Sequence, residues 1–392
     1  MENIDFGWVL LLALLPLFFA LGWFSARIDM RTVLKQAKSI PNGLLNTLNA
    51  LIDNKTNIAT RTLSDIVETE KSDITSYELG LSLGKLYRQR GENDKAINLH
   101  QRLIKSPDLT GNRLHQVQFE LGQDFQNAGL VDRAEREFES LLDTEMANQA
   151  HEILLQIYQQ DRNWQKAIET AGKLSHDATT YQFEIAQFYC ELAQANLFKS
   201  NYDEARSYIQ AALNANKKCT RASLLLGDLE YKLENFQAAC DAYTSIEHQN
   251  YNYLVMASGK LYDAYEALGN PQKALEILLG YARTFPQLDF LNIIYEKSLV
   301  LYGEDEACQT AIKLVRNTPS LAGVHRLLGL NSNEVNPLWK PDIEMMRNVI
   351  AKYIQKSFMY RCQNCHFKSQ VFFWHCPACN RWETFTPHRI EV

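Results

Sequence analysis

Residues 83–101 of the 392-residue chain read LGKLYRQRGENDKAINLHQ. In this stretch a Leu-Gly pair is followed three positions later by an aromatic residue, Tyr87, and nine positions after that by an alanine, Ala96. The same spacing returns in residues 121–134, and a Leu-Gly pair with a later alanine returns in residues 226–239. A unit that recurs every 20 to 50 residues or so is the mark of a repeat architecture. The middle of the chain is therefore predicted to be an array of repeats.

Six alanines mark the clear copies of this unit, with neighbours 33 to 38 residues apart: Ala96, Ala134, Ala167, Ala205, Ala239 and Ala274. The unit resembles the tetratricopeptide repeat, a helix–turn–helix unit of about 34 residues. Its small Gly and Ala residues allow two helices to approach closely, while larger side chains fill the remaining space. Ala59 and Cys308 are expected to take the small position in a degraded copy at each end, where such copies act as caps.

Stacked helix pairs of this kind form a superhelix whose concave face binds peptides or other proteins. We therefore predict a mainly α protein. A single aromatic residue in such an array more often packs in the core than binds a partner, so the partner-binding residues stay unknown at this point. A last amphipathic helix is predicted over residues 341–357, with one apolar face formed by Ile343, Met346, Ile350, Tyr353 and Ile354.

Two Cys-x-x-Cys pairs near the C-terminus form the second distinctive pattern: Cys362, Cys365, Cys376 and Cys379. Each pair supplies two sulfurs from one tight turn, and two such turns complete a tetrahedral tetrathiolate site. A redox dithiol or a pair of disulfides is the alternative, but the segment lacks the βαβ pattern of thioredoxin-like proteins. Four sulfurs suit one iron or one zinc ion equally well.

The segment 358–392 is too short to bury enough apolar surface without a metal. Four aromatic residues are expected to form a small core around the metal: Phe372, Phe373, Trp374 and Trp382. His366 and Asn380 each follow the second cysteine of a pair, where the turn needs a positive φ that His and Asn tolerate. His375 lies beside Cys376 but is not expected to be a ligand, because four sulfurs already complete the tetrahedron.

At the other end, residues 6–26 read FGWVLLLALLPLFFALGWFSA, with no charged residue. As a helix this stretch would extend roughly 31 Å, the thickness of a bilayer core. A cleaved signal peptide would have a basic start and a shorter apolar core, whereas this chain starts with Glu2 and Asp5. Four basic residues follow the stretch, and the positive-inside rule then places the rest of the chain in the cytoplasm: Arg27, Arg31, Lys35 and Lys38.

The charge balance and the absence of catalytic motifs exclude two classes of function. The net charge is −6 and both ends are basic, so the middle is strongly acidic, which argues against nucleic-acid binding. Four thiolates would close the metal site, and there is no phosphate-binding loop, His-Glu-x-x-His or Gly-x-Ser-x-Gly, so we predict no enzyme activity. Four further cysteines are expected to be packing residues in a reducing compartment: Cys190, Cys219, Cys240 and Cys308.

The order of these parts resembles the lipopolysaccharide assembly protein B (LapB) family of Gram-negative bacteria. The resemblance covers the whole chain and divides it into an N-terminal transmembrane helix (1–27), a basic juxtamembrane linker (28–42), a tetratricopeptide-repeat array (43–357) and a rubredoxin-like metal domain (358–392). The residues that carry it are Cys362, Cys365, Trp374-His375-Cys376-Pro377 and Cys379 in the tail, and Arg88 to Gly91, Ala96-Ile97 and His100-Gln101 in the first clear repeat.

The resemblance implies a single-pass scaffold of the inner membrane, facing the cytoplasm, that regulates lipopolysaccharide synthesis. The family helps the membrane protease FtsH degrade the deacetylase LpxC, and is expected to gather other lipopolysaccharide proteins at the inner membrane. It also implies that iron or zinc binds Cys362, Cys365, Cys376 and Cys379. The acidic middle and degraded end repeats depart from the family pattern, which leaves the partner-binding surface and any homo-oligomer undefined. A general adaptor for envelope assembly, unrelated to lipopolysaccharide, is the competing prediction.

Overall fold

The computed structural model describes residues 47–50, 52–53, 55–69, 74–107, 109–174, 181–330 and 338–387, together with Trp23. Apart from Trp23, the predicted span at residues 6–26 and the linker at 28–42 lie outside the described residues. Among the helices that are described, none is both long and apolar enough to cross a membrane. The chain divides into two compact units, Met1–Ile157 and Tyr158–Val392, and each is described by itself.

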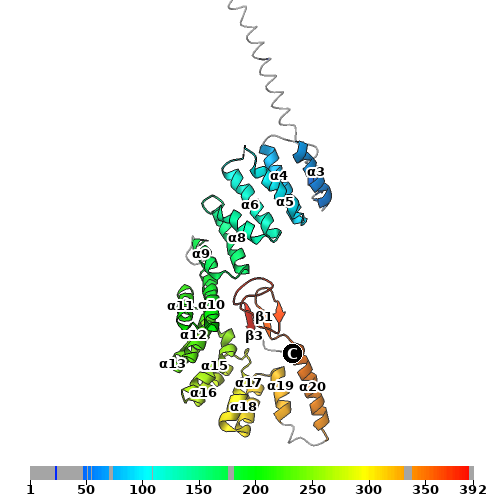
Figure 1. The fold of residues 1–392 in the computed structure, drawn as a ribbon. Coiled ribbons are helices and arrows are strands. Elements are labelled where there is room, and N and C mark those ends of the chain that lie inside the picture. The colour runs from blue at the N-terminus through cyan, green and yellow to red at the C-terminus, as the bar shows by residue number, and fades with distance from the viewer. Residues whose placement is uncertain are drawn as a thin grey trace, which may run out of the picture. The chain divides into compact units, whose positions relative to one another are not determined.

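The first unit is built from helices packed side by side (Figure 1). Its helices are α3 (Thr56–Thr69), α4 (Ile74–Gln89), α5 (Asn93–Ile104), α6 (Asn112–Asn127), α7 (Val131–Glu139) and α8 (Ala147–Gln160), the last of which runs into the second unit. Helix α4 packs against α5, α5 against α6, and α6 against α7. This sequential packing is the arrangement expected of stacked repeats.

The second unit continues the pattern of paired helices. It contains α9 (Trp164–Leu174), α10 (Gln182–Phe198), α11 (Tyr202–Ala215), α12 (Thr220–Lys232), α13 (Phe236–Thr244), α14 (Ile246–Asn250), the 3-10 turn η1 (Tyr251–Tyr253), α15 (Leu254–Ala267), α16 (Pro271–Thr284), α17 (Leu291–Tyr302), α18 (Glu304–Asn317), α19 (Leu321–Leu330) and α20 (Lys340–Lys356). The mainly α fold and the repeat array are thus confirmed.

A small antiparallel sheet follows the last helix. Its strands are β1 (Tyr360–Cys362), β2 (Lys368–Ser369) and β3 (Phe385–Pro387), in the order β2-β1-β3. In the register, Arg361 lies opposite Lys368 on one side and opposite Thr386 on the other. The sheet holds together the segment that carries the two Cys-x-x-Cys pairs.

The small residues of the repeat allow close helix contact, as predicted. All six marker alanines are fully buried. A Cβ atom added at Gly227 would lie 2.3 Å from the Tyr243 ring, and one added at Gly122 would lie 2.8 Å from the Phe138 ring. These contacts are possible only because the glycine leaves its helix surface open to an aromatic ring of the second helix. The Leu-Gly pair of the motif therefore serves packing within each repeat.

Two details of the sequence prediction need correction. Cys308 is only half-buried, and its neighbour Ala307 is fully buried, so Ala307 takes the small position of the last copy. The helix predicted over 341–357 is present as α20, but its expected apolar face is divided. The isoleucines of that face are half-buried, whereas Met346 and Tyr353 are 50% and 55% exposed.

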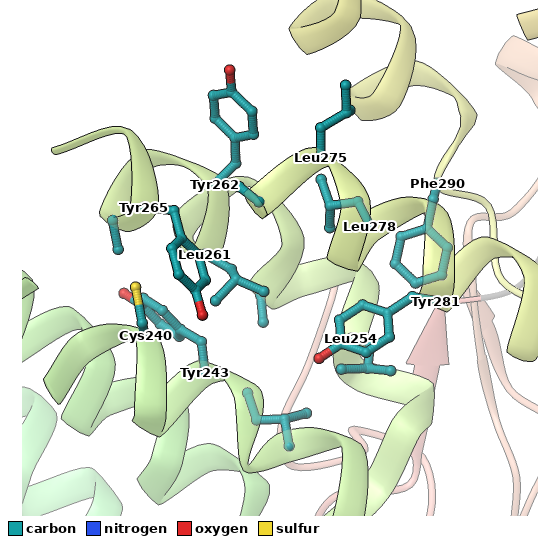
Figure 2. Close-up of a cluster of buried hydrophobic side chains, with 14 of the residues drawn as sticks. Cys240, Tyr243, Leu254, Leu261, Tyr262, Tyr265, Leu275, Leu278, Tyr281 and Phe290 are labelled. Carbon is teal, nitrogen blue, oxygen red and sulfur yellow. The ribbon is translucent and has the colours of Figure 1, made fainter. Parts of the chain in front are cut away.

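The largest described core lies in the second unit and is rich in tyrosine. Tyr243 of α13, Tyr262 of α15 and Tyr281 of α16 belong to one buried cluster with leucines of α15 and α16 (Figure 2). The Tyr243 hydroxyl donates a hydrogen bond of 2.7 Å to Asp228. Burial of such large rings contributes much of the favourable free energy of packing.

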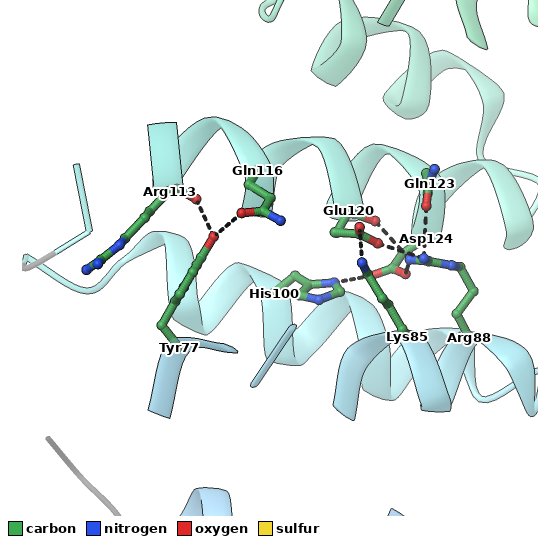
Figure 3. A network of polar contacts seen from close by, with 9 residues as sticks. All are labelled: Tyr77, Lys85, Arg88, His100, Arg113, Gln116, Glu120, Gln123 and Asp124. Atoms are coloured by element: carbon green, nitrogen blue, oxygen red, sulfur yellow. Dashed lines mark hydrogen bonds and ion pairs between the residues drawn. The ribbon is translucent and has the colours of Figure 1, made fainter. Parts of the chain in front are cut away.

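A buried polar network joins three helices of the first unit (Figure 3). The Arg88 guanidinium of α4 pairs with Glu120 at 2.7 Å and with Asp124 at 2.6 Å, both on α6. The second oxygen of Asp124 lies 2.5 Å from Nδ1 of His100 on α5. Asp124 and His100 are fully buried, so this polar network fixes how two successive repeats fit together.

Candidate metal centre

Four sulfur atoms meet beside the small sheet. Cys362 ends β1 and Cys365 follows in the next turn, while Cys376 and Cys379 lie on a turn that precedes β3. The four Sγ atoms all lie within 4.8 Å of one another. The structure therefore brings together, from two segments, the four cysteines that the sequence singles out.

The spacing of these sulfurs fits a tetrahedral metal site. Cys362 Sγ lies 3.8 Å from Cys379 Sγ, and Cys365 Sγ lies 3.7 Å from Cys376 Sγ. In a tetrahedron with metal–sulfur bonds of about 2.3 Å, neighbouring sulfurs are about 3.8 Å apart. The donor set thus fits one metal ion with no open coordination position, and four thiolates suit both iron and zinc.

Two similar turns present the cysteine pairs. The backbone N–H of His366 donates to the carbonyl of Cys362 at 3.0 Å, and that of Asn380 donates to the carbonyl of Cys376 at 2.9 Å. His366 has φ 61° and Asn380 has φ 53°. The left-handed conformation expected at both positions is confirmed. This conformation reverses the chain direction, so that both sulfurs of a pair point toward the same metal position.

Hydrogen bonds favour the thiolate form of one sulfur. Burial raises the pKa of the Cys362 thiol, but the backbone N–H groups of Cys365 and Asn364 and the Thr384 hydroxyl outweigh burial and lower this pKa to about 6. The Thr384 hydroxyl oxygen lies 3.3 Å from Cys362 Sγ. Because a metal ligand must be deprotonated, these groups favour the metal-binding form of Cys362, whereas burial raises the pKa of Cys376 to about 12.

His375 holds the second turn in place. Its ring is not part of the cluster of four sulfur atoms. Its Nε2 lies 2.9 Å from the carbonyl oxygen of Asn380, and since a carbonyl can only accept, Nε2 donates. The imidazole ring also lies 4.4 Å from the Trp382 ring, centroid to centroid. These contacts give His375 a structural position, in line with the prediction that it is not a ligand.

The aromatic residues of the module divide between two roles. Phe373 packs edge-on against Phe385 at 5.7 Å, and Phe372 also borders the small core around the cysteines. The expectation for the two tryptophans is confirmed only in part. Trp374 packs edge-on against Phe372 at 4.8 Å, but both tryptophan rings also contact the repeat array. A core of this size needs few rings, and the remaining apolar surface is buried against the helices.

Aromatic stacking attaches the module to helices of the second unit. The Trp382 ring lies 5.9 Å from the Trp164 ring and 6.0 Å from the Phe188 ring. The Trp374 ring stacks on Tyr253 at 5.2 Å, and β3 contacts η1, which carries this tyrosine. Phe188 and Tyr253 are fully buried, so the attachment excludes water.

A buried carboxyl group lies within the attachment. Glu383 Oε2 accepts a hydrogen bond of 3.0 Å from Gln187 Nε2, and the Glu383 backbone N–H donates to the carbonyl of Trp374 at 2.7 Å. Burial raises the pKa of Glu383 to about 7, although hydrogen bonds from Thr220 and Gln187 and the charge of Arg221 act in the opposite direction. The free energy of the attachment should therefore depend on pH.

Arg221 lies near both tryptophans of the module. Its guanidinium carbon is 5.6 Å from the Trp374 ring centroid and 5.9 Å from that of Trp382, distances suited to cation–π attraction. The same group pairs with Glu191 at 2.9 Å and donates to Gln194 at 2.7 Å. Sequence analysis did not single out Arg221, because nothing in its local pattern indicates a partner so distant in the chain.

The cysteines outside the module serve mainly as packing residues, as predicted. Cys190, Cys219 and Cys240 are fully buried, and Cys308 is half-buried. Cys190 Sγ lies 3.7 Å from Cys219 Sγ. Burial and this neighbour raise the pKa of Cys190 well above its ordinary value, so the thiol stays protonated and unreactive.

A groove of about 380 Å³ lies on the second unit, lined mainly by α10, α12 and α15. Phe198 borders the groove and is 82% exposed, and Tyr231 adds a second accessible ring. Lys260 pairs with Asp228 in its wall at 2.6 Å. A groove with accessible rings and placed charges is suited to hold a peptide side chain.

Both the metal module and the repeats match known protein families. Residues 360–387 match the rubredoxin metal binding domain family, and residues 79–113 and 190–253 match tetratricopeptide-repeat families. Among solved structures, Naa15/Naa10 bound to HypK-THB aligns over 80% of this chain and 51% of that chain, with 11% identity and a TM-score of 0.44.

Two curated relatives match over nearly the full length. Lipopolysaccharide assembly protein B of Escherichia coli strain K12 is 30% identical over 385 residues, or 97% of this chain and 98% of that protein. The protein of the same name from Haemophilus influenzae is 31% identical over 391 residues, or 96% of this chain and 98% of that protein. The chain therefore belongs to the lipopolysaccharide assembly protein B family.

Proposed function

We propose that the protein is an adaptor for lipopolysaccharide assembly that acts at the inner membrane and promotes degradation of the deacetylase LpxC by the protease FtsH. The main support is its full-length relation to lipopolysaccharide assembly proteins. A metal site closed by four sulfurs adds to it, because a catalytic metal keeps an open position. The protein would act by holding two partners together, without covalent chemistry of its own.

The groove on α10, α12 and α15 is the proposed site for the client. Phe198 and Tyr231 offer apolar surface, and the charged side chains of the wall would select the orientation of a bound segment. Holding a client beside a membrane protease raises its effective concentration into the mM range when the connection is short. An increase of this kind is enough to speed degradation.

The metal proposed for the module is one iron or zinc ion bound by Cys362, Cys365, Cys376 and Cys379. Bound there, the ion would cross-link the two turns and stabilise a segment that has only a small core. Cys376→Ser should release the metal from the purified protein while the helices keep their circular dichroism signal. Cys308→Ser is the matched control and should keep the metal. Full metal occupancy in Cys376→Ser, measured by elemental analysis, would contradict the assignment of the four cysteines as metal ligands.

The uncharged stretch 6–26 is the proposed membrane anchor, with the repeats in the cytoplasm. An alkaline phosphatase fused after Val392 should be inactive. An active fusion would show that the C-terminal end faces the periplasm and that the proposed orientation is wrong. Removal of residues 1–27 should leave a folded, metal-loaded protein that no longer supports degradation. A foreign single span in their place should restore degradation if the stretch only anchors the chain.

The decisive measurement is the half-life of the deacetylase, followed by immunoblot after translation is blocked. It should lengthen in cells that lack the protein, and also in cells with Phe198→Asp, which places a charge in the groove. Tyr302→Asp places a charge on another exposed aromatic residue, outside the groove, and is the control. An unchanged half-life without the protein would contradict the proposal and favour a general adaptor for envelope assembly.

A further inference from the structure

Helix α20 carries an apolar stripe that no described residue covers. None of its residues is buried. The half-buried ones lie on one face, and α20 packs against α19: Ile343, Ile350, Ala351 and Ile354. On the remaining surface, four large apolar side chains are 50% to 63% exposed: Met345, Met346, Val349 and Tyr353. Neighbouring apolar side chains this exposed mark an interaction site.

The exposed residues form one continuous line along the helix. With 3.6 residues per turn, Met345, Val349 and Tyr353 fall in a sector about 100° wide, and Met346 lies at its edge. Asp342 and Lys356 fall in the same sector, one at each end of the line. The stripe is therefore apolar in its middle, acidic at its start and basic at its end, and it faces away from the isoleucines on the half-buried side.

The stripe is symmetric about Val349. Four residues before it stands Met345 and four after it Tyr353, while seven before it stands Asp342 and seven after it Lys356. In an antiparallel pair of identical helices related by a two-fold axis, residue i of one meets residue j of the other, and j meets i. With the axis at Val349, each Asp342 would face a Lys356, and each Met345 would face a Tyr353.

We propose that two copies of this protein associate through α20, antiparallel, with Val349 on the two-fold axis. The successive spacings of 342, 345, 349, 353 and 356 are three, four, four and three residues, close to the three-and-four spacing of helices that pack along a common seam. Two reciprocal ion pairs would fix the register, and the methionines and tyrosines would exclude water between them. The proposal does not depend on which client the protein holds.

The charge order selects a second copy over other occupants. A membrane surface attracts helices whose polar flanks are basic, whereas this stripe has an acid at one end. An unrelated helix would fit only if it carried the opposite charge order at the same spacing. An antiparallel copy of α20 has that order by symmetry.

Charge reversal tests the proposal in the full-length, metal-loaded protein. Sedimentation equilibrium in detergent should find a dimer for the unaltered chain. Asp342→Lys and Lys356→Asp should each weaken the dimer about tenfold, because each places like charges opposite one another twice. The double variant, Asp342→Lys with Lys356→Asp, should restore the dimer, because both ion pairs form again in reverse.

Two further variants keep the test specific. Val349→Asp places two carboxylates together on the axis and should weaken the dimer by about a hundredfold or more. Glu344→Lys alters a charge outside the stripe and should leave the dimer unchanged. Helicity and metal content should stay constant in every variant. A monomeric unaltered chain, a dimeric Val349→Asp, or a double variant no stronger than the single ones would overturn the proposal.

Discussion

Replacing Glu383 by Gln should remove a pH dependence from the attachment of the metal module. The carboxyl group is held among Gln187, Thr220 and Arg221, and burial raises its pKa from 4.5 to about 7. A raised carboxyl pKa means that the folded protein holds the proton more tightly than the unfolded chain. The stabilisation is therefore complete below pH 4.5 and is lost as the pH rises through 7.

The size of the effect follows from the shift. Each pH unit in which only the folded state is protonated is worth about 1.4 kcal/mol. Between pH 6 and pH 8 most of the remaining titration takes place, so the wild-type protein should lose about 1 kcal/mol relative to Glu383→Gln. The amide of Gln can still pair with Gln187 and Thr220 but cannot ionise.

Urea unfolding followed by tryptophan emission suits this measurement. Trp164, Trp374 and Trp382 all lie at the attachment, so the signal reports its opening even if the repeats unfold in separate steps. Glu276→Gln, at an exposed position, is the control for the loss of one charge. If the stability difference between wild type and Glu383→Gln is the same at pH 6 and pH 8, the argument from the buried carboxyl group is wrong.

Three further results are expected. Gly227→Ala should destabilise the second unit by about 1–3 kcal/mol, because its Cβ would meet the Tyr243 ring at 2.3 Å; thermal unfolding would measure this. Gly280→Ala, with open space around it, should instead stabilise the helix by about 0.5–1 kcal/mol in the same assay. Asp124→Asn should destabilise the first unit by about 3–5 kcal/mol, because Arg88 loses a buried partner, and hydrogen exchange in α4 and α6 should increase.

The sequence by itself determined the repeat array and the metal site. Both depend on local spacing: a small residue such as Ala96 recurs where helices touch, and Cys362 with Cys365 share one turn. The positive φ of His366 and Asn380 was also predicted, because the geometry of such a turn depends on only a few consecutive residues. Interactions of this range leave a periodic or fixed pattern in a single sequence.

Only the tertiary structure decided how the module is attached and which face of α20 is exposed. Glu383 and Gln187 are 196 residues apart in the chain, and no local pattern links positions at that distance. For the same reason the contacts of Trp374 and Trp382 with the repeat array were not predicted. Helical periodicity shows that α20 has an apolar side. It does not show which of these apolar residues contact α19 and which belong to the exposed stripe around Val349. That boundary depends on how the helices pack, because burial is a property of the whole arrangement and not of one segment.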